Sequence, residues 1–248
     1  MKSLSMQKAA MKLKSINYYE YVKSFIFAIV LAVLFRSFLI EPYSIPSGSM
    51  HPTLLEGDYI FSTKYSYGYS RYSFPFGLNI FSDRLFKSQP ERGDIIIFRG
   101  TRGGLTYIKR LIGLPGDKIQ LINKVLYING KAIPQVYKGT YDNYTMCAYE
   151  ATACNMYMET LPNGVSYTIL QANTDDKPEY TDTTMVYEVP PQHYFFMGDN
   201  RSNSIDSRFL KREIAYVPEV NLIARPKYLV LTTDFNRLAQ GRFFKEIQ

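Results

Sequence analysis

The chain has 248 residues, of which 46% are apolar and 15% aromatic, and its formal net charge is +7. This apolar content excludes wholesale disorder, and many Tyr and Phe residues without any Trp favour a β-rich protein over a helical bundle. Residues 1–41 carry a net charge of +4 and residues 42–248 only +3. Because the larger part is close to neutral and has no dense Lys/Arg stripe, we expect no nucleic-acid partner.

An apolar segment follows a basic N-terminal arm. Residues 1–23 contain five lysines, whereas Arg36 is the only charged residue in 24–40. Seventeen helical residues span about 25 Å, the lower end of a membrane span. A buried soluble helix and a cleavable signal peptide are the alternatives, but Phe38–Tyr43 offers no small residues for cleavage. We therefore expect a single-pass anchor whose N-terminus is cytoplasmic, because the lysines precede it.

Several short apolar runs after the anchor are bounded by turn residues, which is typical of antiparallel strands. The predicted strands are Asp94–Arg99, Leu105–Ile112, Lys118–Ile122, Val125–Ile128, Tyr194–Met197, Glu219–Ala224 and Lys227–Thr232. The Gly/Pro-interrupted aromatic segment Tyr65–Phe86 is predicted to be a loop that lies against the outer leaflet, since Tyr and Phe suit that interface.

Residues 131–190 differ from their surroundings because they are rich in Tyr, Thr and Asn and alternate only weakly. We predict a mostly β protein: an antiparallel β-sheet core formed by 41–130 and 191–248, with 131–190 as an inserted irregular β subdomain. The basic arm at 1–23 and one N-terminal transmembrane helix at 24–40 precede this core.

The two cysteines, Cys147 and Cys154, both lie in the inserted segment. In an oxidising compartment a disulfide between them is plausible, and two free thiols are the alternative. The bond would close a small loop and stabilise the fold by about 2–3 kcal/mol at most. With only two histidines in the chain, a Cys/His zinc site has no support, and we expect no metal or other cofactor.

A first candidate for chemistry is Ser49, which lies among Pro46, Gly48 and Pro52. These residues favour an exposed turn that can present a hydroxyl group and leave backbone N–H groups free for an oxyanion. An ordinary Ser/Pro turn after a membrane helix is the alternative.

A nucleophilic serine needs a base, and the sequence places neither His51 nor His193 beside Ser49. On a strand, Lys109 shares one face with Tyr107 and Leu111. Burial on that face would lower the lysine pKa towards that of a usable base. An ordinary surface lysine is the alternative.

A polar loop, Gly198–Arg208 (GDNRSNSIDSR), directly follows a predicted strand. Its alternating acids and arginines can form internal ion pairs, and its serines can orient a neighbouring group. The spacing of an EF-hand and the Gly-Lys-Ser/Thr of a P-loop are both absent, so neither site is expected.

Taken together and in this order, the motifs resemble the type I signal peptidases (leader peptidases). The resemblance is carried by Ser47–Leu54 (SGSMHPTL), Arg92–Phe98 (RGDIIIF), Tyr107–Asp117 (YIKRLIGLPGD) and the loop Gly198–Arg208. It implies Ser49 as the nucleophile and Lys109 as the general base. It also implies an oxyanion hole formed by the Ser47 hydroxyl and the Ser49 backbone N–H.

The same resemblance implies that Ser204 orients the Lys109 amine and that Asp206 and Arg208 hold Ser204 in place. The chain departs from the family pattern at Ser202, where Asp is common, and at Ala215, where Gly is common. These departures bear on loop geometry and substrate fit and leave the Ser/Lys dyad intact.

The sequence thus predicts a serine endopeptidase in the bacterial cytoplasmic membrane, with its catalytic domain on the extracytoplasmic side. It would remove signal peptides from translocated preproteins after small residues at positions −3 and −1. Its expected partners are preprotein signal peptides and the lipid bilayer, and the secretion translocon is a further candidate. The alternatives are a peptidase dedicated to a pilin or another single substrate, a non-catalytic membrane-tethered binding module, and a self-cleaving Ser/Lys repressor relative, which should carry a DNA-binding domain.

Overall fold

A computed structural model describes residues 18–74, 83–101, 104–141, 147, 153–173, 181–209, 214–239 and 241–247. The helices are α1 (Tyr18–Phe38) and α2 (Phe235–Ala239). The strands are β1 (Ile40–Ser44), β2 (Asp58–Thr63), β3 (Ile95–Arg99), β4 (Thr106–Gly113), β5 (Lys118–Ile122), β6 (Val125–Ile128), β7 (Lys131–Ala132), β8 (Gln135–Thr140), β9 (Ala153–Thr160), β10 (Ser166–Asn173), β11 (Tyr187–Glu188), β12 (His193–Met197), β13 (Val217–Pro218), β14 (Leu222–Thr232) and β15 (Lys245–Glu246). The prediction of a mostly β protein with one N-terminal apolar helix is confirmed.

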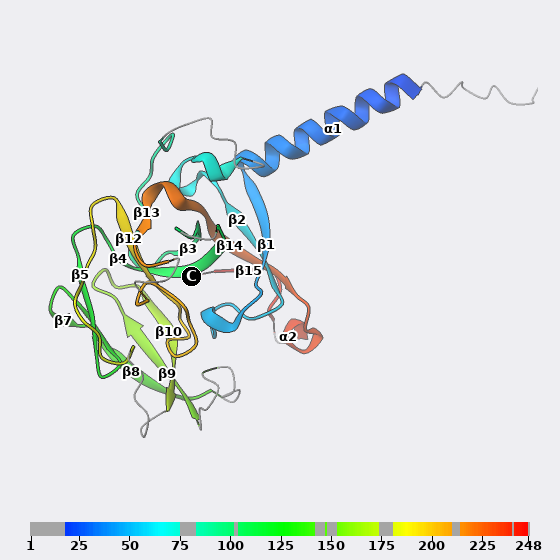
Figure 1. Ribbon diagram of the computed structural model, residues 1–248. Coiled ribbons are helices and arrows are strands. Elements are labelled where there is room, and N and C mark those ends of the chain that lie inside the picture. The colour runs from blue at the N-terminus through cyan, green and yellow to red at the C-terminus, as the bar shows by residue number, and fades with distance from the viewer. Residues whose placement is uncertain are drawn as a thin grey trace, which may run out of the picture.

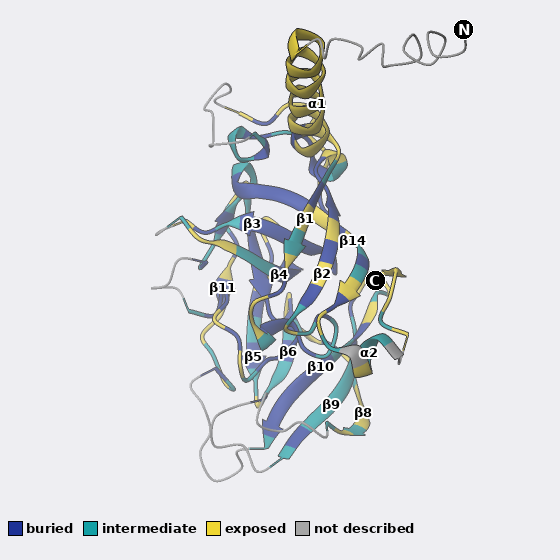
Figure 2. Cartoon of the chain, turned by 90° about the vertical axis from the view of Figure 1, so that its right-hand side faces the viewer, coloured by how far each residue is buried: buried dark blue, intermediate teal, exposed yellow. Residues whose placement is uncertain are grey.

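Helix α1 extends away from the β-sheet body, and nearly all of its side chains are exposed (Figures 1 and 2). Its 21 residues correspond to about 31 Å at 1.5 Å per residue, which matches the hydrocarbon core of a bilayer. It is the one helix in the described residues that is long and apolar enough to cross a membrane. The helix begins at Tyr18 instead of residue 24, and residues 1–17 of the predicted basic arm lie outside the described residues.

The main sheet is a curled antiparallel sheet with the strand order β1-β2-β14-β3-β4-β12-β13, and β15 pairs with β14. Five expected strands are confirmed as β3, β4 and β12 of this sheet and as β5 and β6 of a second sheet with the order β11-β5-β6-β7, each within one residue of its predicted bounds. Strand β4 lies between β3 and β12, with Lys109 opposite Ile96. This central position places both faces of β4 against packed side chains.

Strand β14 corrects one prediction, because Leu222–Thr232 is a single strand where two strands were expected. Residues Glu219–Asn221 form a 3₁₀ turn before it. Pro226 does not end the strand because the register with β2 shifts between Pro226 and Tyr228, and β14 changes its other partner from β3 to β15 along its length. A proline is tolerated at such an irregularity since its missing N–H is not needed there.

Strands β8, β9 and β10 form a separate three-stranded antiparallel sheet, here called the inserted sheet. Its β9–β10 hairpin pairs without a register shift over eight residues on each strand, which is more regular than the weak sequence alternation indicated. Leu161, Tyr167 and Ile169 from this region pack with Ile112 and Phe195 of the main sheet. The inserted segment therefore shares a hydrophobic core with the main sheet.

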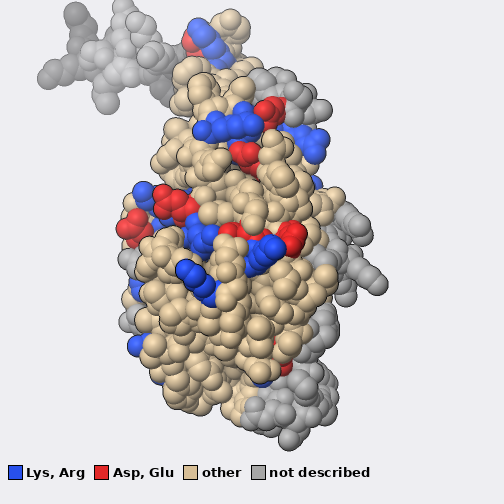
Figure 3. Space-filling model, turned by 90° about the vertical axis from the view of Figure 1, so that its left-hand side faces the viewer, with Lys and Arg blue, Asp and Glu red and all other residues tan. Residues whose placement is uncertain are grey.

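Charged side chains are mixed in sign over the face shown in Figure 3. Acids and bases lie next to one another in two bands, and the remainder of this face is largely uncharged. Near α1, Glu41 pairs with both Arg36 and Lys64, at 2.7 Å and 2.9 Å.

Candidate active site

Ser49 lies in a 3₁₀ turn, Gly48–Met50, that follows β1. Its Oγ is 3.4 Å from Ser47 Oγ. Met50 and Ile45, on either side of the turn, are buried in an apolar cluster and fix it on the sheet. Ser47 is exposed as expected of a turn, but Ser49 itself is buried. The predicted exposed turn is therefore exposed at Ser47 but not at Ser49, because Lys109 contacts the Ser49 hydroxyl group and the loop 198–208 binds the Ser49 carbonyl group.

Lys109 of β4 donates a hydrogen bond from Nζ to Ser49 Oγ at 2.5 Å. The lysine is 4% exposed, and no carboxylate in the described residues lies within ion-pair distance of Nζ. Burial lowers the pKa of Lys109 from 10.5 to about 8, although Asp206 and Asp199 act in the opposite direction. A buried amine with this pKa can give up its proton near neutral pH.

The loop 198–208 contacts the backbone of the Ser49 turn. Asn200 donates from its backbone N–H to Ser49 O at 3.1 Å and from Nδ2 to Gly48 O at 3.1 Å. Gly198 lies equally close, since a Cβ atom there would be 2.5 Å from Ser49 O and would also collide with Ser204. Only glycine fits at this position, so the loop and the Ser49 turn form one packed unit.

Asp206 and Arg208 form a buried bidentate ion pair within this loop, with both N–O distances at 2.8 Å. Asp206 also accepts the Gly198 N–H at 3.0 Å. Burial raises the pKa of Asp206, but the Arg208 guanidinium and these hydrogen bonds outweigh it and hold that pKa below its usual value. Ser204 is buried beside them and its side chain contributes to the lowered pKa of Asp206, but no hydrogen bond joins its Oγ to Lys109.

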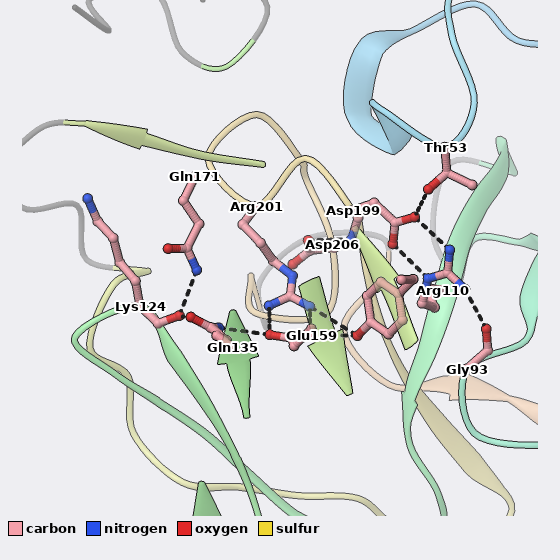
Figure 4. Close-up of polar contacts among 12 residues, drawn as sticks. Thr53, Gly93, Arg110, Lys124, Gln135, Glu159, Gln171, Asp199, Arg201 and Asp206 are labelled. Carbon is pink, nitrogen blue, oxygen red and sulfur yellow. Dashed lines mark hydrogen bonds and ion pairs between the residues drawn. The ribbon is translucent and has the colours of Figure 1, made fainter. Parts of the chain in front are cut away.

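Two further buried ion pairs flank the site and were not assigned from the sequence (Figure 4). Arg110 binds both carboxylate oxygens of Asp199, at 2.8 Å and 2.7 Å, and Thr53 Oγ1 donates to the same carboxylate. Arg201 pairs with Glu159 of the inserted sheet. An arginine inside the apolar strand Tyr107–Ile112 is a sequence signal for such a pair, since an unpaired charge is rarely buried.

Neither histidine contacts Ser49. His51 is buried, and its Nδ1 lies 3.3 Å from the Tyr141 hydroxyl oxygen while Nε2 accepts the Glu56 N–H at 3.4 Å. Burial, followed by the charge of Arg237, lowers the pKa of His51 to about 4. His193 lies on β12 with Nδ1 2.8 Å from Pro191 O. His51 is therefore neutral at physiological pH and engaged elsewhere.

Cys147 and Cys154 are joined in a disulfide with a Cα–Cα distance of 5.8 Å. Both pack against Leu170 and Ala172 of β10, the strand that contacts the loop 198–208. Within the described part of the chain, no group of three or more His, Cys, Asp or Glu side chains is arranged to hold a metal ion.

Comparison with known proteins supplies relatives for most of the chain. The family model described as "Signal peptidase, peptidase S26" matches residues 18–231. Signal peptidase I of Rickettsia canadensis (strain McKiel) is 46% identical over 220 residues, covering 85% of this chain and 79% of that relative. Signal peptidase I of Rickettsia massiliae (strain Mtu5) is also 46% identical, over 216 residues, covering 85% and 78%. Among solved structures, a signal peptidase I from Enterococcus faecalis V583 is 28% identical with a TM-score of 0.32, covering 56% of this chain and 97% of that one.

Proposed function

Because the chain belongs to the signal peptidase family, peptidase S26, we propose that it removes signal peptides from translocated preproteins with Ser49 as nucleophile and Lys109 as general base. The observation that carries this proposal is the 2.5 Å hydrogen bond between Lys109 Nζ and Ser49 Oγ inside a buried site. A nucleophile within hydrogen-bond reach of a base is the arrangement that hydrolysis through an acyl-enzyme requires.

The lowered pKa of Lys109 supports its role as a base. An amine can accept a proton only when it is neutral, and at pH 7 an ordinary lysine is neutral in only about one molecule in several thousand. With a pKa of about 8, about one molecule in ten has a neutral Lys109 at the same pH. Burial thus raises the population of competent enzyme by about two orders of magnitude, without any additional charged partner.

The proposed reaction proceeds in two steps. Neutral Lys109 takes the Ser49 proton as Oγ attacks the scissile carbonyl carbon, and the resulting ammonium then protonates the leaving amine as the C–N bond breaks. Water next attacks the ester on Ser49, with Lys109 again accepting a proton and then returning it to the Ser49 oxygen as the product acid departs. The same side chain therefore serves as base and acid in each half of the cycle.

We assign the oxyanion hole to the Ser47 hydroxyl and the Ser49 backbone N–H. The 3.4 Å separation of the two Oγ atoms supports this assignment, because it places the Ser47 hydroxyl near the attacking oxygen. The Asp206–Arg208 pair supports the loop around Ser204. For Ser204 as the group that orients Lys109, the support is its burial in this loop beside Gly198.

We propose that cleavage follows small side chains at positions −3 and −1. Apolar residues surround the Ser49 turn, namely Ile45, Ile60 and Ile97 with the partly buried Tyr43 and Ile108. Of these, only Tyr43 and Ile108 are accessible to a substrate, and a shallow apolar surface of this kind would admit a small side chain and exclude a large one.

We further propose that α1 anchors the enzyme in the bacterial cytoplasmic membrane, with residues 1–17 in the cytoplasm and the β-sheet body outside. The aromatic segment Tyr65–Phe86 supports contact with the outer leaflet, because Tyr69 donates to Phe38 O at 2.8 Å and its ring packs against Phe38 at the end of α1. Residues 75–82 of this segment lie outside the described residues. If replacing Tyr65 and Phe86 left lipid binding unchanged, the contact would be rejected.

Preprotein cleavage in detergent tests the proposed function. The wild type should cleave after a small residue, identified by sequencing the new N-terminus, and Ser49→Ala should not cleave. Ser88→Ala, which changes an exposed serine outside the site, is the matched control and should cleave like the wild type. A folded wild type that cleaves no preprotein would favour the binding module. Cleavage of a single preprotein from a broad panel would favour the dedicated peptidase.

A further inference from the structure

The inserted sheet binds the backbone of the loop 198–208 on both sides of Asn200. The Leu170 N–H of β10 donates to Asp199 O, and the Arg201 N–H donates to Leu170 O, each at 2.9 Å. Asn200 lies between these two bonds and binds the carbonyl groups of Ser49 and Gly48. The inserted sheet is thus connected to the Ser49 turn through Asn200.

Glu159 of β9 is the only buried carboxylate among the described residues of 131–190. Tyr167 donates to it at 2.6 Å and Gln135 at 2.9 Å, so two other side chains of the inserted sheet orient it. The remaining bonds come from Arg201, whose Nη1 and Nη2 each bind one carboxylate oxygen (Figure 4). The inserted sheet therefore presents a fixed carboxylate to Arg201 of the loop 198–208.

This pair is better suited to fixing a position than to stabilising the fold. Removing two charges from water offsets most of their attraction, so a buried ion pair is weak evidence for stability. A bidentate arginine–carboxylate pair nevertheless allows one relative orientation of its two segments. Arg201 also accepts Arg208 Nη2 at its carbonyl oxygen at 2.7 Å, which connects the Glu159 pair to the Asp206–Arg208 pair.

We propose that Glu159 is a positioning residue for signal-peptide cleavage. It acts through Arg201 and Asn200 to hold the Ser49 turn at the position where the Ser49 hydroxyl group meets Lys109. The inserted sheet would thus take part in catalysis without contacting the substrate. This inference rests on the proposed function. Different results would contradict the proposed function and this inference. The proposed function is rejected if the wild type does not cleave preproteins, whereas the inference is rejected if the wild type and a Glu159 variant cleave at the same rate.

The test compares Glu159→Gln with Glu188→Gln in preprotein cleavage. Glu188 is an exposed glutamate of the same segment that pairs with Lys118 on the surface, so it is a matched control. We expect Glu159→Gln to lower kcat by about tenfold or more with little change in KM, since a small misplacement of a nucleophile is costly. Glu188→Gln should cleave like the wild type. Equal kcat values for Glu159→Gln and the wild type would overturn the proposal.

The pH dependence of kcat separates positioning from a general loss of stability. The charged groups that act on Lys109 are Asp199, Asp206 and Arg208, all carried by the loop 198–208, and burial is the largest influence on its pKa. A loosened loop admits water to Lys109, which raises the pKa of the lysine. The acidic limb of the pH–rate profile of Glu159→Gln should therefore move to higher pH. A merely structural role would lower the melting temperature and leave the limb in place, which would also contradict the proposal.

Tyr167→Phe gives a second, milder variant should Glu159→Gln fail to fold. It removes one hydrogen bond to Glu159 and keeps the ring that packs beneath the Arg110 guanidinium at 4.0 Å. We expect a severalfold decrease in kcat and a shift of the acidic limb in the same direction. An unchanged kcat and an unchanged limb in this variant would overturn the proposal.

Discussion

Two buried cations occupy neighbouring positions on β4, on opposite faces of the strand, and they have opposite surroundings. Lys109 contacts the Ser49 hydroxyl and has no carboxylate within ion-pair distance in the described residues. Arg110 is bound by Asp199 through two bonds, donates a third to Gly93 O at 2.8 Å, and lies over the Tyr167 ring. Burial lowers the pKa of both groups, but Asp199 more than compensates at Arg110, whose pKa is raised, whereas that of Lys109 falls to about 8.

The difference shows that a partner, and not burial alone, decides what a buried cation can do. A paired arginine keeps its charge and fixes the position of the loop that carries Asp199. An unpaired lysine loses part of its preference for the charged form and becomes available as a base. One strand thus contributes a structural cation and a proposed catalytic cation in consecutive residues.

The largest expected effect is the loss of activity when Lys109 is replaced. Lys109→Met and Lys109→Arg should each lower kcat by at least about 10³-fold, because neither side chain can accept the Ser49 proton. Cleavage of a preprotein in detergent measures this, with Lys118→Met, a change at an exposed lysine, as the control. Activity retained in Lys109→Arg would rule out the general-base role.

Replacing Arg110 should affect stability before chemistry. Arg110→Met leaves the Asp199 carboxylate buried without its main partner, and we expect the free energy of unfolding to fall by about 3–5 kcal/mol. Urea denaturation followed by circular dichroism measures it. The double variant Arg110→Met/Asp199→Leu removes both charges and should recover most of the loss. A single variant as stable as the wild type would show that the two neighbouring cations are not distinguished by pairing.

Replacing Lys109 should have the opposite effect on stability. The pKa of Lys109 is lowered in the folded protein, which means that the native state binds this proton more weakly than the unfolded chain does. Below about pH 8 the lysine is protonated in both states, and burying the charged ammonium lowers the free energy of unfolding. The difference from 10.5 to about 8 corresponds to about 3 kcal/mol, present at pH 7 and lost as pH rises from about 8 to 10.5.

Lys109→Met should therefore be more stable than the wild type at pH 7, and the gain should shrink towards pH 10. Urea midpoints across this range measure the difference. A gain that does not depend on pH would show that the buried ammonium carries no such penalty.

Much of the fold could be predicted because the strands are apolar runs bounded by turn residues, as β3 and β4 illustrate. The early start of α1 could not, since Tyr18–Lys23 includes Glu20 and Lys23 and does not read as apolar. The continuity of β14 through Pro226 was also hidden, because it depends on which strands flank that proline.

The candidate site likewise contains features that the sequence predicts and features that it does not. The turn around Ser49 and the strand around Lys109 have local patterns that point to their chemistry. The Arg110–Asp199 pair joins residues 89 positions apart, and one sequence does not show which arginine meets which carboxylate. The role of Glu159 was still harder to predict from the sequence, because its burial arises from the packing of a segment whose polar composition indicates exposure.

The smallest expected effect is that of His51, which lies two residues from Ser49 in the chain but bonds elsewhere. Its pKa of about 4 keeps it neutral through the working range, so it cannot produce a kinetic transition near pH 8. His51→Gln should therefore keep kcat within about twofold of the wild type and leave the acidic limb at about pH 8, where Lys109 places it. A pH–rate profile of both enzymes measures this. If the acidic limb moved in His51→Gln, His51 and not Lys109 would be the general base.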